Sequence, residues 1–215
     1  MSKQNWKKLG LIYKPNKELW WQQSHCQTPS GYWIDENAVR VFFATRDGNY
    51  KSRPMYIDFD FSKLSVINQS TEPLLDLGGI GFFDEDAVFP RSVIKLENEI
   101  RMYYFGWHLG LGKRFYVSIG LAISRDGGKT FKRFSNGPLI GQNIYDPCGV
   151  GSPFIFIEDD IYKMIYGSVT SWTSEEMTTY YLKYTESEDG ISWNNLRHDA
   201  IKLKDDESHT AVISV

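Results

Sequence analysis

The chain has 215 residues, of which 41% are hydrophobic and 15% aromatic, and its formal net charge is −3. These values argue against an intrinsically disordered chain, which would have few aromatic residues and a large net charge, and they suffice for a domain with a buried core. Acidic and basic residues are mixed along the whole chain without a long Lys/Arg run, so nucleic acid is not an expected partner.

The N-terminal stretch "MSKQNWKKLGLIYKP" lacks the apolar segment of a secretory signal, and no apolar run approaches the length of a membrane span. The only two cysteines, Cys26 and Cys148, form neither a disulfide framework nor a metal-binding cluster, and they fit reduced thiols. We therefore expect a cytoplasmic protein with no membrane partner, no metal and no cofactor.

Short segments rich in β-branched and aromatic residues follow one another along the chain and are separated by turn formers. The first is "WKKLGLI" at residues 6–12, and the next clear one is "VRVFFATRD". A set of four comes next, "AVFPRSVIKL", "EIRMYYFGW", "VSIGLAISR" and "KTFKRF", followed by a second set, "VGSPFIFIE", "DIYKMIYGSV", "YYLKYTESE" and "SWNNL". This composition predicts strands, and no segment has the sustained 3.6-residue apolar period of a helix.

The segments repeat with a period of about 62 residues, the scale of one supersecondary unit. Residues of the same type recur at this step: Pro29, Pro90 and Pro153; Met102 and Met164; Asp126 and Asp189. Four antiparallel strands repeated in line are typical of β-propeller blades. We predict an all-β chain, a single domain over residues 1–215, with blades at about 27–70, 87–134 and 149–196.

Both ends of the chain suggest an incomplete ring. Residues 6–12 resemble the fourth strands of the later units, so we expect them to close a propeller by pairing with its last blade. The final "ESHTAVISV" reads as the first strand of a fourth blade. A five-bladed ring would need on the order of 300 residues, and open edges would have to be covered by another chain, which predicts an oligomer. A smaller complete fold is the alternative.

One turn motif occurs twice in the sequence, as "SRDGGKTF" at residues 124–131 and as "SEDGISW" at residues 187–193. The Asp carboxylate can accept backbone N–H bonds across the turn, while Gly supplies a positive φ. We expect the following aromatic residue, Phe131 or Trp193, to be buried against the neighbouring blade. The motif is similar to the Asp-box of sialidases, although a six-bladed sialidase would also need an arginine triad that is not evident.

Four stretches carry a resemblance to a known superfamily: "WWQQSHCQTP", "RVFFATRDGNYKSRPMYIDFD", "SIGLAISRDGGKTF" and "YDPCGVGSP". They resemble the five-bladed β-propeller glycosidases, which include glycoside hydrolase families 32, 43, 62 and 68. The likeness is greatest to glycosyl-hydrolase-like proteins found among bacterial polysaccharide biosynthesis genes. It implies an enzyme acting on glycosidic bonds of a carbohydrate, or a non-catalytic carbohydrate-binding propeller in polysaccharide assembly.

The candidate site residues stand a few positions before the first strand of each blade, where they would ring one mouth of the central channel. Carboxylates there suit glycosidic cleavage, which needs one protonated and one ionised carboxyl group, roughly 5–10 Å apart. The candidate catalytic residues are Asp84, Asp86, Asp146 and Glu207. The candidate substrate-binding residues are His25, Gln27, Arg46, Asp47, Arg91, Trp107 and His209. We expect the carboxylates to converge on the mouth with His25.

Several of these residues also have a structural interpretation. Asp84 and Asp86 lie in "FFDEDAVF", where an Asp often caps a turn, and Asp146 precedes a proline, a pair that starts turns. Arg46 and Asp47 at a strand end suggest an ion pair that orients other residues. The resembling enzymes also place an Asp on the first blade, where this chain has "SHCQTP"; its absence weakens a standard hydrolase mechanism and favours the binding alternative.

Overall fold

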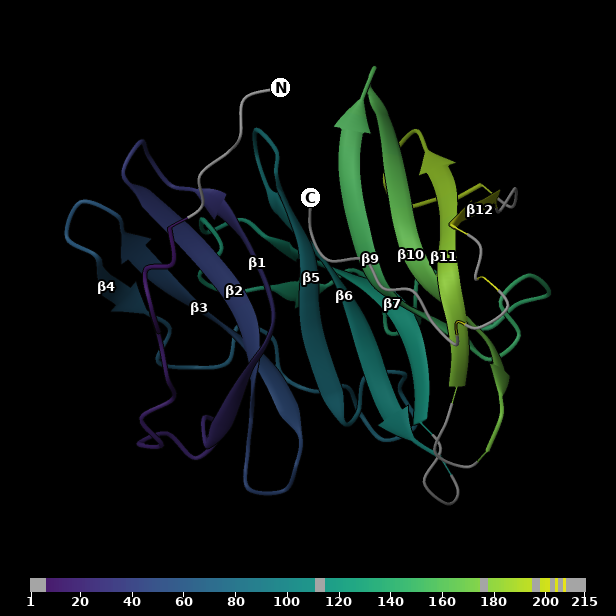
Figure 1. The fold of residues 1–215 in the computed structure, drawn as a ribbon, viewed down its shortest axis with the longest axis horizontal. Coiled ribbons are helices and arrows are strands. Elements are labelled where there is room, and N and C mark those ends of the chain that lie inside the picture. The colour runs from purple at the N-terminus through teal and green to yellow at the C-terminus, as the bar shows by residue number, and fades with distance from the viewer. Residues whose placement is uncertain are drawn as a thin grey trace.

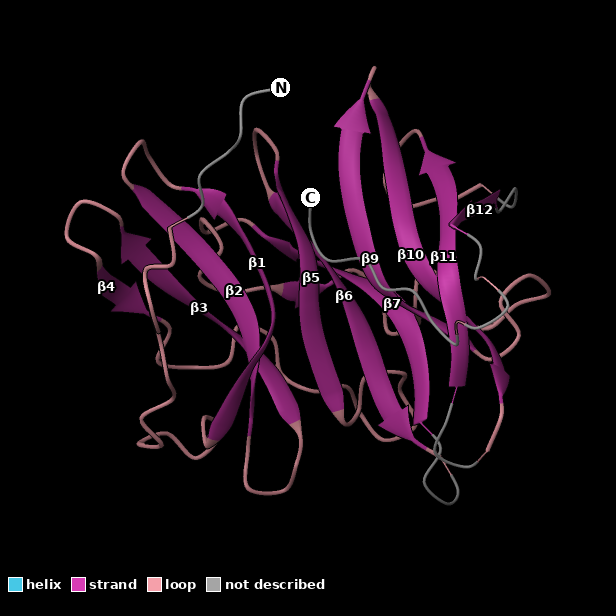
Figure 2. Ribbon diagram, viewed as in Figure 1, coloured by secondary structure: helices cyan, strands magenta, loops and turns pink. Residues whose placement is uncertain are grey.

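A computed structural model describes residues 7–110, 115–174, 178–194, 198–201, 204 and 207, and within these residues it contains strands and no helix (Figure 2). The strands are β1 (Ser24–Trp33), β2 (Ala38–Arg46), β3 (Ser52–Asp60), β4 (Ser65–Gln69), β5 (Ala87–Lys95), β6 (Ile100–Leu109), β7 (Phe115–Ser124), β8 (Lys132–Arg133), β9 (Gly149–Glu158), β10 (Ile161–Trp172), β11 (Thr178–Ser187) and β12 (His198–Ile201).

The strands form three antiparallel four-stranded blades, which we call blade 1 (β1–β4), blade 2 (β5–β8) and blade 3 (β9–β12). Figure 1 shows them side by side in chain order. One parallel bridge, between Ser52 of β3 and Ala87 of β5, joins blades 1 and 2 into a continuous sheet. The first strands are neighbours, since β5 contacts both β1 and β9. The predicted all-β propeller architecture is confirmed.

Two strand predictions differ from the structure. Residues 7–12, expected to form a closing strand, are not in a strand, and Trp6 lies outside the described residues. The fourth strand of blade 3 is β12, which pairs with β11 beyond the expected limit at residue 196. The segment expected to begin a fourth blade lies outside the described residues except for Glu207.

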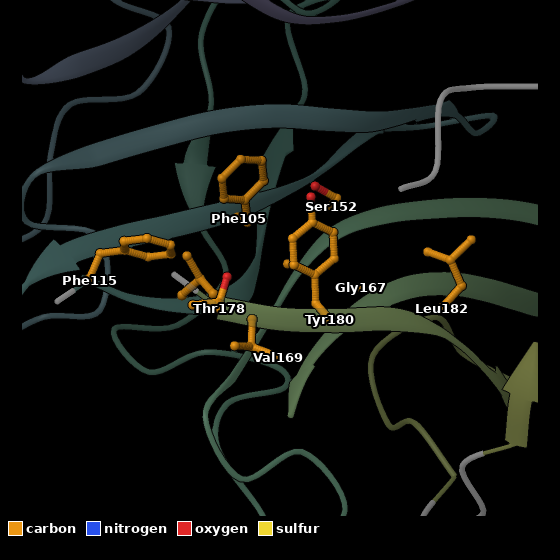
Figure 3. Close-up of a pocket in the computed structure, with 10 residues that line it drawn as sticks. Phe105, Phe115, Ser152, Gly167, Val169, Thr178, Tyr180 and Leu182 are labelled. Carbon is orange, nitrogen blue, oxygen red and sulfur yellow. The ribbon is translucent and has the colours of Figure 1, made fainter. Parts of the chain in front are cut away.

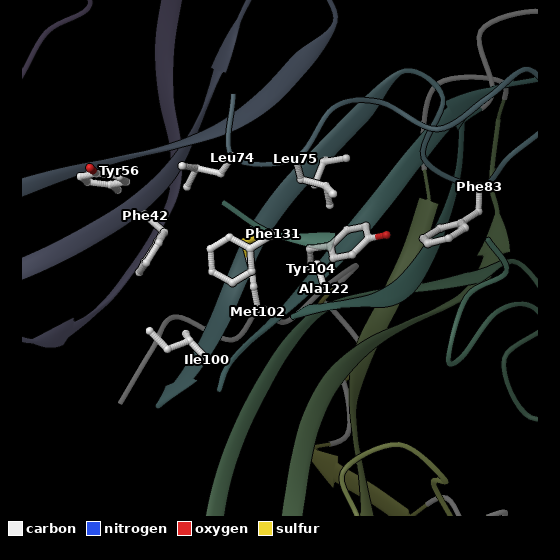
Figure 4. Close-up of a cluster of buried hydrophobic side chains, with 11 residues drawn as sticks. Phe42, Tyr56, Leu74, Leu75, Phe83, Ile100, Met102, Tyr104, Ala122 and Phe131 are labelled. Atoms are coloured by element: carbon white, nitrogen blue, oxygen red, sulfur yellow. The ribbon is translucent and has the colours of Figure 1, made fainter. Parts of the chain in front are cut away.

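Apolar side chains fill the interface between blades 1 and 2 (Figure 4). Phe131, which follows the Asp126 turn of blade 2, packs edge-on against Phe42 of blade 1 with ring centroids 5.8 Å apart. Met102 on β6 belongs to the same buried cluster. Edge-to-face aromatic pairs of this kind contribute about 0.5–1.5 kcal/mol beyond the area that they bury.

The interface between blades 2 and 3 repeats this arrangement one unit later. Trp193, which follows the Asp189 turn, packs edge-on against Tyr103 of blade 2 with ring centroids 6.3 Å apart. The sequence prediction that each of the two aromatic residues is buried against the neighbouring blade is therefore confirmed, and in both cases that blade is the preceding one.

The turns themselves are closed by their aspartates. Asp126 Oδ1 accepts from the backbone N–H groups of Lys129 and Thr130, both at 3.0 Å, and Asp189 Oδ1 accepts from those of Ile191 and Ser192, both at 2.7 Å. The bonds from the Ser192 and Ile191 N–H groups lower the pKa of the Asp189 carboxyl group to about 2.

A latch that the sequence analysis missed joins each turn to the preceding blade. Arg40 of β2 donates to the carbonyl of Gly127 at 2.7 Å, and Arg101 of β6 donates to the carbonyl of Asp189 at 2.6 Å. Arg40 is itself held by a buried ion pair with Asp58, with Nε–Oδ1 at 2.7 Å. A charged donor thus fixes each turn at the blade interface.

Candidate functional site

The first strands of the three blades are irregular near their prolines. β1 pairs with β2 through register shifts on either side of Gln27, and β5 and β9 each show one shift, near Pro90 and opposite Gly167 respectively. Thr28 and Ser152, each directly before a proline, have left-handed φ values of 54° and 51°. Bulges change the direction of side chains, and residues with strained backbone conformations often cluster at functional sites. We therefore expect candidate site residues on and just before these strands.

Asp84 lies before β5 and is completely buried, with 0% exposed surface. Its Oδ2 forms an ion pair with Arg133 Nε at 2.8 Å and accepts a hydrogen bond from the Tyr104 hydroxyl at 2.9 Å. Burial raises the pKa of Tyr104, so this hydroxyl stays protonated and donates. Oδ1 has no hydrogen-bond partner. The carboxylate therefore has no surface exposed to solvent or to a ligand in this structure.

Asp146 has the same position in blade 3 and is also 0% exposed. Its Oδ1 accepts from the Ser168 hydroxyl at 2.6 Å and faces Lys183 Nζ at 3.1 Å, while Oδ2 accepts from Asn143 Nδ2 at 3.0 Å and the Tyr166 hydroxyl at 3.2 Å. Both carboxylate oxygens are therefore occupied by protein groups.

Asp84 and Asp146 are 62 residues apart, and so are their tyrosine partners, which indicates one structural device used twice. Gly106 takes the place of the serine that satisfies Asp146. A Cβ added at Gly106 would lie 2.5 Å from the Cβ of Asp84 and 2.6 Å from the ring of Phe83, so only glycine fits.

Asp86, two residues after Asp84, has a different environment. Its side chain is 22% exposed, Oδ1 forms an ion pair with Lys51 Nζ at 3.1 Å, and Oδ2 accepts from the backbone N–H of Leu109 at 2.9 Å. Its own N–H donates to the carbonyl of Trp107 at 3.1 Å, and its carbonyl accepts from Ser52 N–H at 3.1 Å. Asp86 therefore presents a partly accessible carboxylate at the junction of blades 1 and 2.

The expected ion pair between Arg46 and Asp47 is wrong. Asp47 Oδ2 pairs instead with Arg53 Nη1 at 2.8 Å, and its Oδ1 accepts from Asn49 and Lys51 N–H groups in the turn. The physical reason is that neighbouring residues of an extended chain point to opposite faces, so Arg46 and Asp47 diverge.

Three polar side-chain atoms on the strands that meet at this junction are buried and have no hydrogen-bond partner: Arg46 Nε on β2, Ser52 Oγ on β3 and Trp107 Nε1 on β6. Trp107 belongs to a small apolar cluster that also contains Ala44, Ala87 and Phe89. The sequence analysis named Arg46 and Trp107 as substrate-binding candidates and missed Ser52, which looks like an ordinary strand serine when the pairing of β3 with β5 is unknown.

The remaining candidates are more dispersed. His25 is exposed and its Nδ1 contacts the Ser24 hydroxyl at 2.8 Å, Gln27 has a buried Oε1 without a partner, and burial lowers the pKa of Arg91. Glu207 is exposed and accepts from Lys204 N–H at 2.9 Å, while His209 lies outside the described residues. The structure thus places Asp86 at the junction of blades 1 and 2, where its backbone is hydrogen-bonded to Trp107 and Ser52, and holds Asp84 and Asp146 within their own blades.

A separate cavity of about 180 Å³ lies between blades 2 and 3 (Figure 3). Its lining is mostly apolar and comes from Phe105, Phe115, Val117, Gly151, Ser152, Gly167, Val169, Thr178, Tyr180 and Leu182. Figure 3 shows the Phe105 and Tyr180 rings on facing sides of it. It contains no carboxylate and none of the candidate site residues.

Within the described part of the chain, no group of three or more His, Cys, Asp or Glu residues is arranged to hold a metal ion, and no helix is long and apolar enough to cross a membrane. Cys26 and Cys148 are not joined to each other.

No protein-family model matches the sequence. Two proteins of Mycobacterium tuberculosis that are described as uncharacterized, Rv1502 and MT1551, are each 31% identical to it over 190 residues. The match covers 87% of this chain and 63% of each relative, so the chain spans less than two thirds of their length.

Solved structures of glycoside hydrolases share the fold. A protein described as a glycoside hydrolase superposes with a TM-score of 0.68 at 15% identity, over 95% of this chain and 65% of its own. The sucrose-6-phosphate hydrolase of Lactobacillus gasseri gives 0.62 at 14% identity, over 80% of this chain and 34% of its own. A family 117 glycoside hydrolase of Zobellia galactanivorans gives 0.61 at 15%, over 88% and 50%. The predicted resemblance to the β-propeller glycosidases is confirmed at the level of the fold.

Proposed function

We propose that the chain binds a carbohydrate at the junction of blades 1 and 2 and acts on its glycosidic bonds, as part of a glycoside hydrolase-like protein. The observation that carries the proposal is the environment of Asp86, a partly exposed carboxylate at the junction of blades 1 and 2 that lies beside the ammonium group of Lys51. A pocket that recognises sugars needs such groups, because sugar hydroxyls donate to carboxylates and accept from N–H and O–H groups.

The chemistry assigns distinct roles to the two accessible carboxylates. Hydrolysis uses one ionised and one protonated carboxyl group on opposite sides of the scissile bond. Asp86 is held in an ion pair with Lys51 and suits the ionised role, as base or nucleophile. The acid has to come from a second carboxyl group, for which Glu207 is the candidate because it is exposed and Asp84 and Asp146 are not.

Carbohydrate binding without turnover is the second candidate function. It is favoured by the burial of Asp84 and Asp146, which removes two of the four candidate carboxylates from contact with a ligand. A binding propeller needs the sugar-contacting groups around Asp86 and does not need an acid.

The two functions are separated by replacing Asp86 with Asn in the full chain and measuring both release of sugar and binding. Aryl glycosides and bacterial surface polysaccharide serve as substrates, with calorimetry for binding. We expect Asp86→Asn to reduce turnover by at least a hundredfold, because a catalytic carboxylate contributes about 10²–10⁴-fold. Glu97→Gln, an exposed loop residue on the turn between β5 and β6, is the matched control and should retain wild-type activity. Wild-type binding with no turnover on any substrate would reject the hydrolase and support the binding module.

A further inference from the structure

The cavity between blades 2 and 3 lies where the repeat departs from its own pattern (Figure 3). In blade 2, Phe89 of β5 is paired with Phe105 of β6, and their rings stack with centroids 4.7 Å apart. The positions 62 residues later are Gly151 of β9 and Gly167 of β10, which are also paired with each other and which both line the cavity. Blade 3 thus has two glycines at the place where blade 2 has two aromatic rings.

The backbone does not require glycine at these two positions. Neither Gly151 nor Gly167 has a positive φ. A Cβ added at Gly151 would lie 3.8 Å from the Phe105 ring, and one added at Gly167 would lie 3.5 Å from the Gly151 carbonyl oxygen, which are ordinary van der Waals distances. Glycine weakens a strand interior and often marks a site where a ligand comes close to the backbone. The two glycines therefore keep open a space that larger residues could fill.

The size and the lining of the cavity define what it can hold. Its volume is about 180 Å³ and its walls are mostly apolar. An apolar protein cavity of about 150 Å³ takes up benzene, whereas pockets for drug-sized ligands begin at about 300 Å³. A sugar ring is a poor occupant, because most of its hydroxyl groups would exchange hydrogen bonds to water for contact with apolar walls. The cavity therefore suits a single apolar ring.

The walls favour an aromatic ring over a saturated one. Phe105, Phe115 and Tyr180 contribute rings to the lining, and Figure 3 shows those of Phe105 and Tyr180 on facing sides. Aromatic rings attract one another in offset-stacked or edge-to-face arrangements beyond the effect of the area that they bury. Ser152 and Thr178 add hydroxyl groups, which can hydrogen-bond to one polar substituent. The left-handed φ of 51° at Ser152 is a strain of the kind that clusters at ligand sites.

We infer that this cavity binds a small aromatic ligand of the phenol class, a single six-membered ring that carries one hydroxyl group. The ligand ring lies against the two glycines and supplies the aromatic contact that Phe89 and Phe105 make within blade 2. The cavity contains no carboxylate and Asp86 does not line it, so the site is separate from the proposed carbohydrate site. The inference therefore goes beyond the proposed function and does not depend on it.

The test is calorimetric titration of the full chain with phenol and with cyclohexanol. We expect saturable binding of phenol that is about two- to tenfold tighter than that of cyclohexanol, the ratio that an aromatic pair contributes. Gly167→Phe places in blade 3 the residue that blade 2 has, and it should fill the cavity. It should weaken phenol binding at least about tenfold, the loss expected when one ring is no longer buried, and leave carbohydrate binding unchanged.

Gly137→Phe is the matched control, because it adds the same side chain at an exposed loop position where no other atom lies within 4 Å of the new Cβ. It should bind phenol as the wild type does. Urea unfolding shows whether Gly167→Phe is folded. If it is not, Gly167→Ala decides the matter, because its methyl group meets the nearest atom at an ordinary contact distance. Gly167→Ala should keep the wild-type urea midpoint and bind phenol more weakly.

A wild type that does not bind phenol would overturn the inference, and so would equal phenol affinity in the wild type and in the folded Gly167 variant. Excess glucose should not displace phenol; displacement would overturn the inference by placing the ring at the carbohydrate site. Self-association of the wild type that Gly167→Phe abolishes, without phenol binding, would overturn it by assigning the cavity to a side chain of a second copy. If phenol binds in the cavity and no glycan binds, the inference stands and the proposed function fails.

Discussion

Replacing Asp146 with Asn tests whether this buried carboxylate is structural or catalytic. In the wild type its Oδ1 faces Lys183 Nζ at 3.1 Å and accepts from Ser168, and its Oδ2 accepts from Asn143 and Tyr166. Asparagine keeps the shape but removes the negative charge and replaces one acceptor by an N–H donor. The ammonium group of Lys183, also buried, is then left without a counter-charge.

The size of the effect follows from that unpaired charge. Removing one partner of a buried ion pair costs about 3–5 kcal/mol. Total stabilities of proteins are only about 5–15 kcal/mol, so Asp146→Asn should destabilise the chain strongly. For a chain of this size each kcal/mol corresponds to about 2–4 °C, and we expect the melting temperature to fall by about 10 °C.

Urea unfolding followed by tryptophan fluorescence measures this loss, and the double variant Asp146→Asn/Lys183→Met supplies the control. Removing both charges and keeping the aliphatic stem should recover much of the stability, because the unpaired ammonium is gone. A variant Asp146→Asn with a wild-type urea midpoint and abolished glycosidase activity would refute the reasoning and return Asp146 to the catalytic residues.

Two further predictions concern the repeated turn. Trp193→Ala should lower the free energy of unfolding by about 3–5 kcal/mol in urea, because it empties the interface against Tyr103, whereas Ile144→Ala at an exposed position should change it little. The pKa of Asp126 and that of Asp189 are both lowered in the folded chain, the latter to about 2. At Asp126, burial raises the pKa, but hydrogen bonds from Thr130 and Ser124 outweigh that effect. These aspartates therefore stabilise the fold above pH 4 and lose that contribution as the pH falls towards 2; the effect is modest because both are solvent-exposed. The urea midpoint should therefore decline less steeply from pH 5 to pH 2 in the double variant Asp126→Asn/Asp189→Asn than in the wild type. Equal declines would contradict this prediction.

The blade architecture is predictable from the sequence because the same local chemistry is written more than once. The turns at Asp126 and Asp189, with the aromatic residues that follow them, set both the period and the interface. The latch from Arg40 to the carbonyl of Gly127 was not predictable, because its acceptor is a backbone atom 87 positions away and leaves no side-chain signal.

The sequence predicts where the candidate carboxylates stand in the repeat but not their environments. Counting back from the prolines finds Asp84, Asp86 and Asp146. Spacing alone does not show which of these carboxylates forms an ion pair and a tyrosine hydrogen bond inside its own blade. Burial decides this, and burial depends on partners such as Arg133 on β8 and Lys183 on β11 that occupy non-equivalent places in the repeat. Ser52 is brought next to Asp86 only by the bridge between β3 and β5, which periodicity within a blade does not reveal.

The repeat also explains why Asp86 stands apart from the buried pair. Its counterpart in blade 3 is Cys148, 62 residues on, and the equivalence is visible in the backbone: Asp86 N–H donates to Trp107 O and Cys148 N–H donates to Val169 O, both at 3.1 Å. In blade 1 the residue that makes the same backbone bond is Gln23, whose N–H donates to Arg46 O at 2.9 Å. At this point of the repeat, blade 2 alone among the three blades carries a carboxylate, and the glutamine amide and the thiol supply no charge that competes with it. In the proposed hydrolase, this single carboxylate means that any acid acting with Asp86 has to come from outside the equivalent positions of blades 1 and 3.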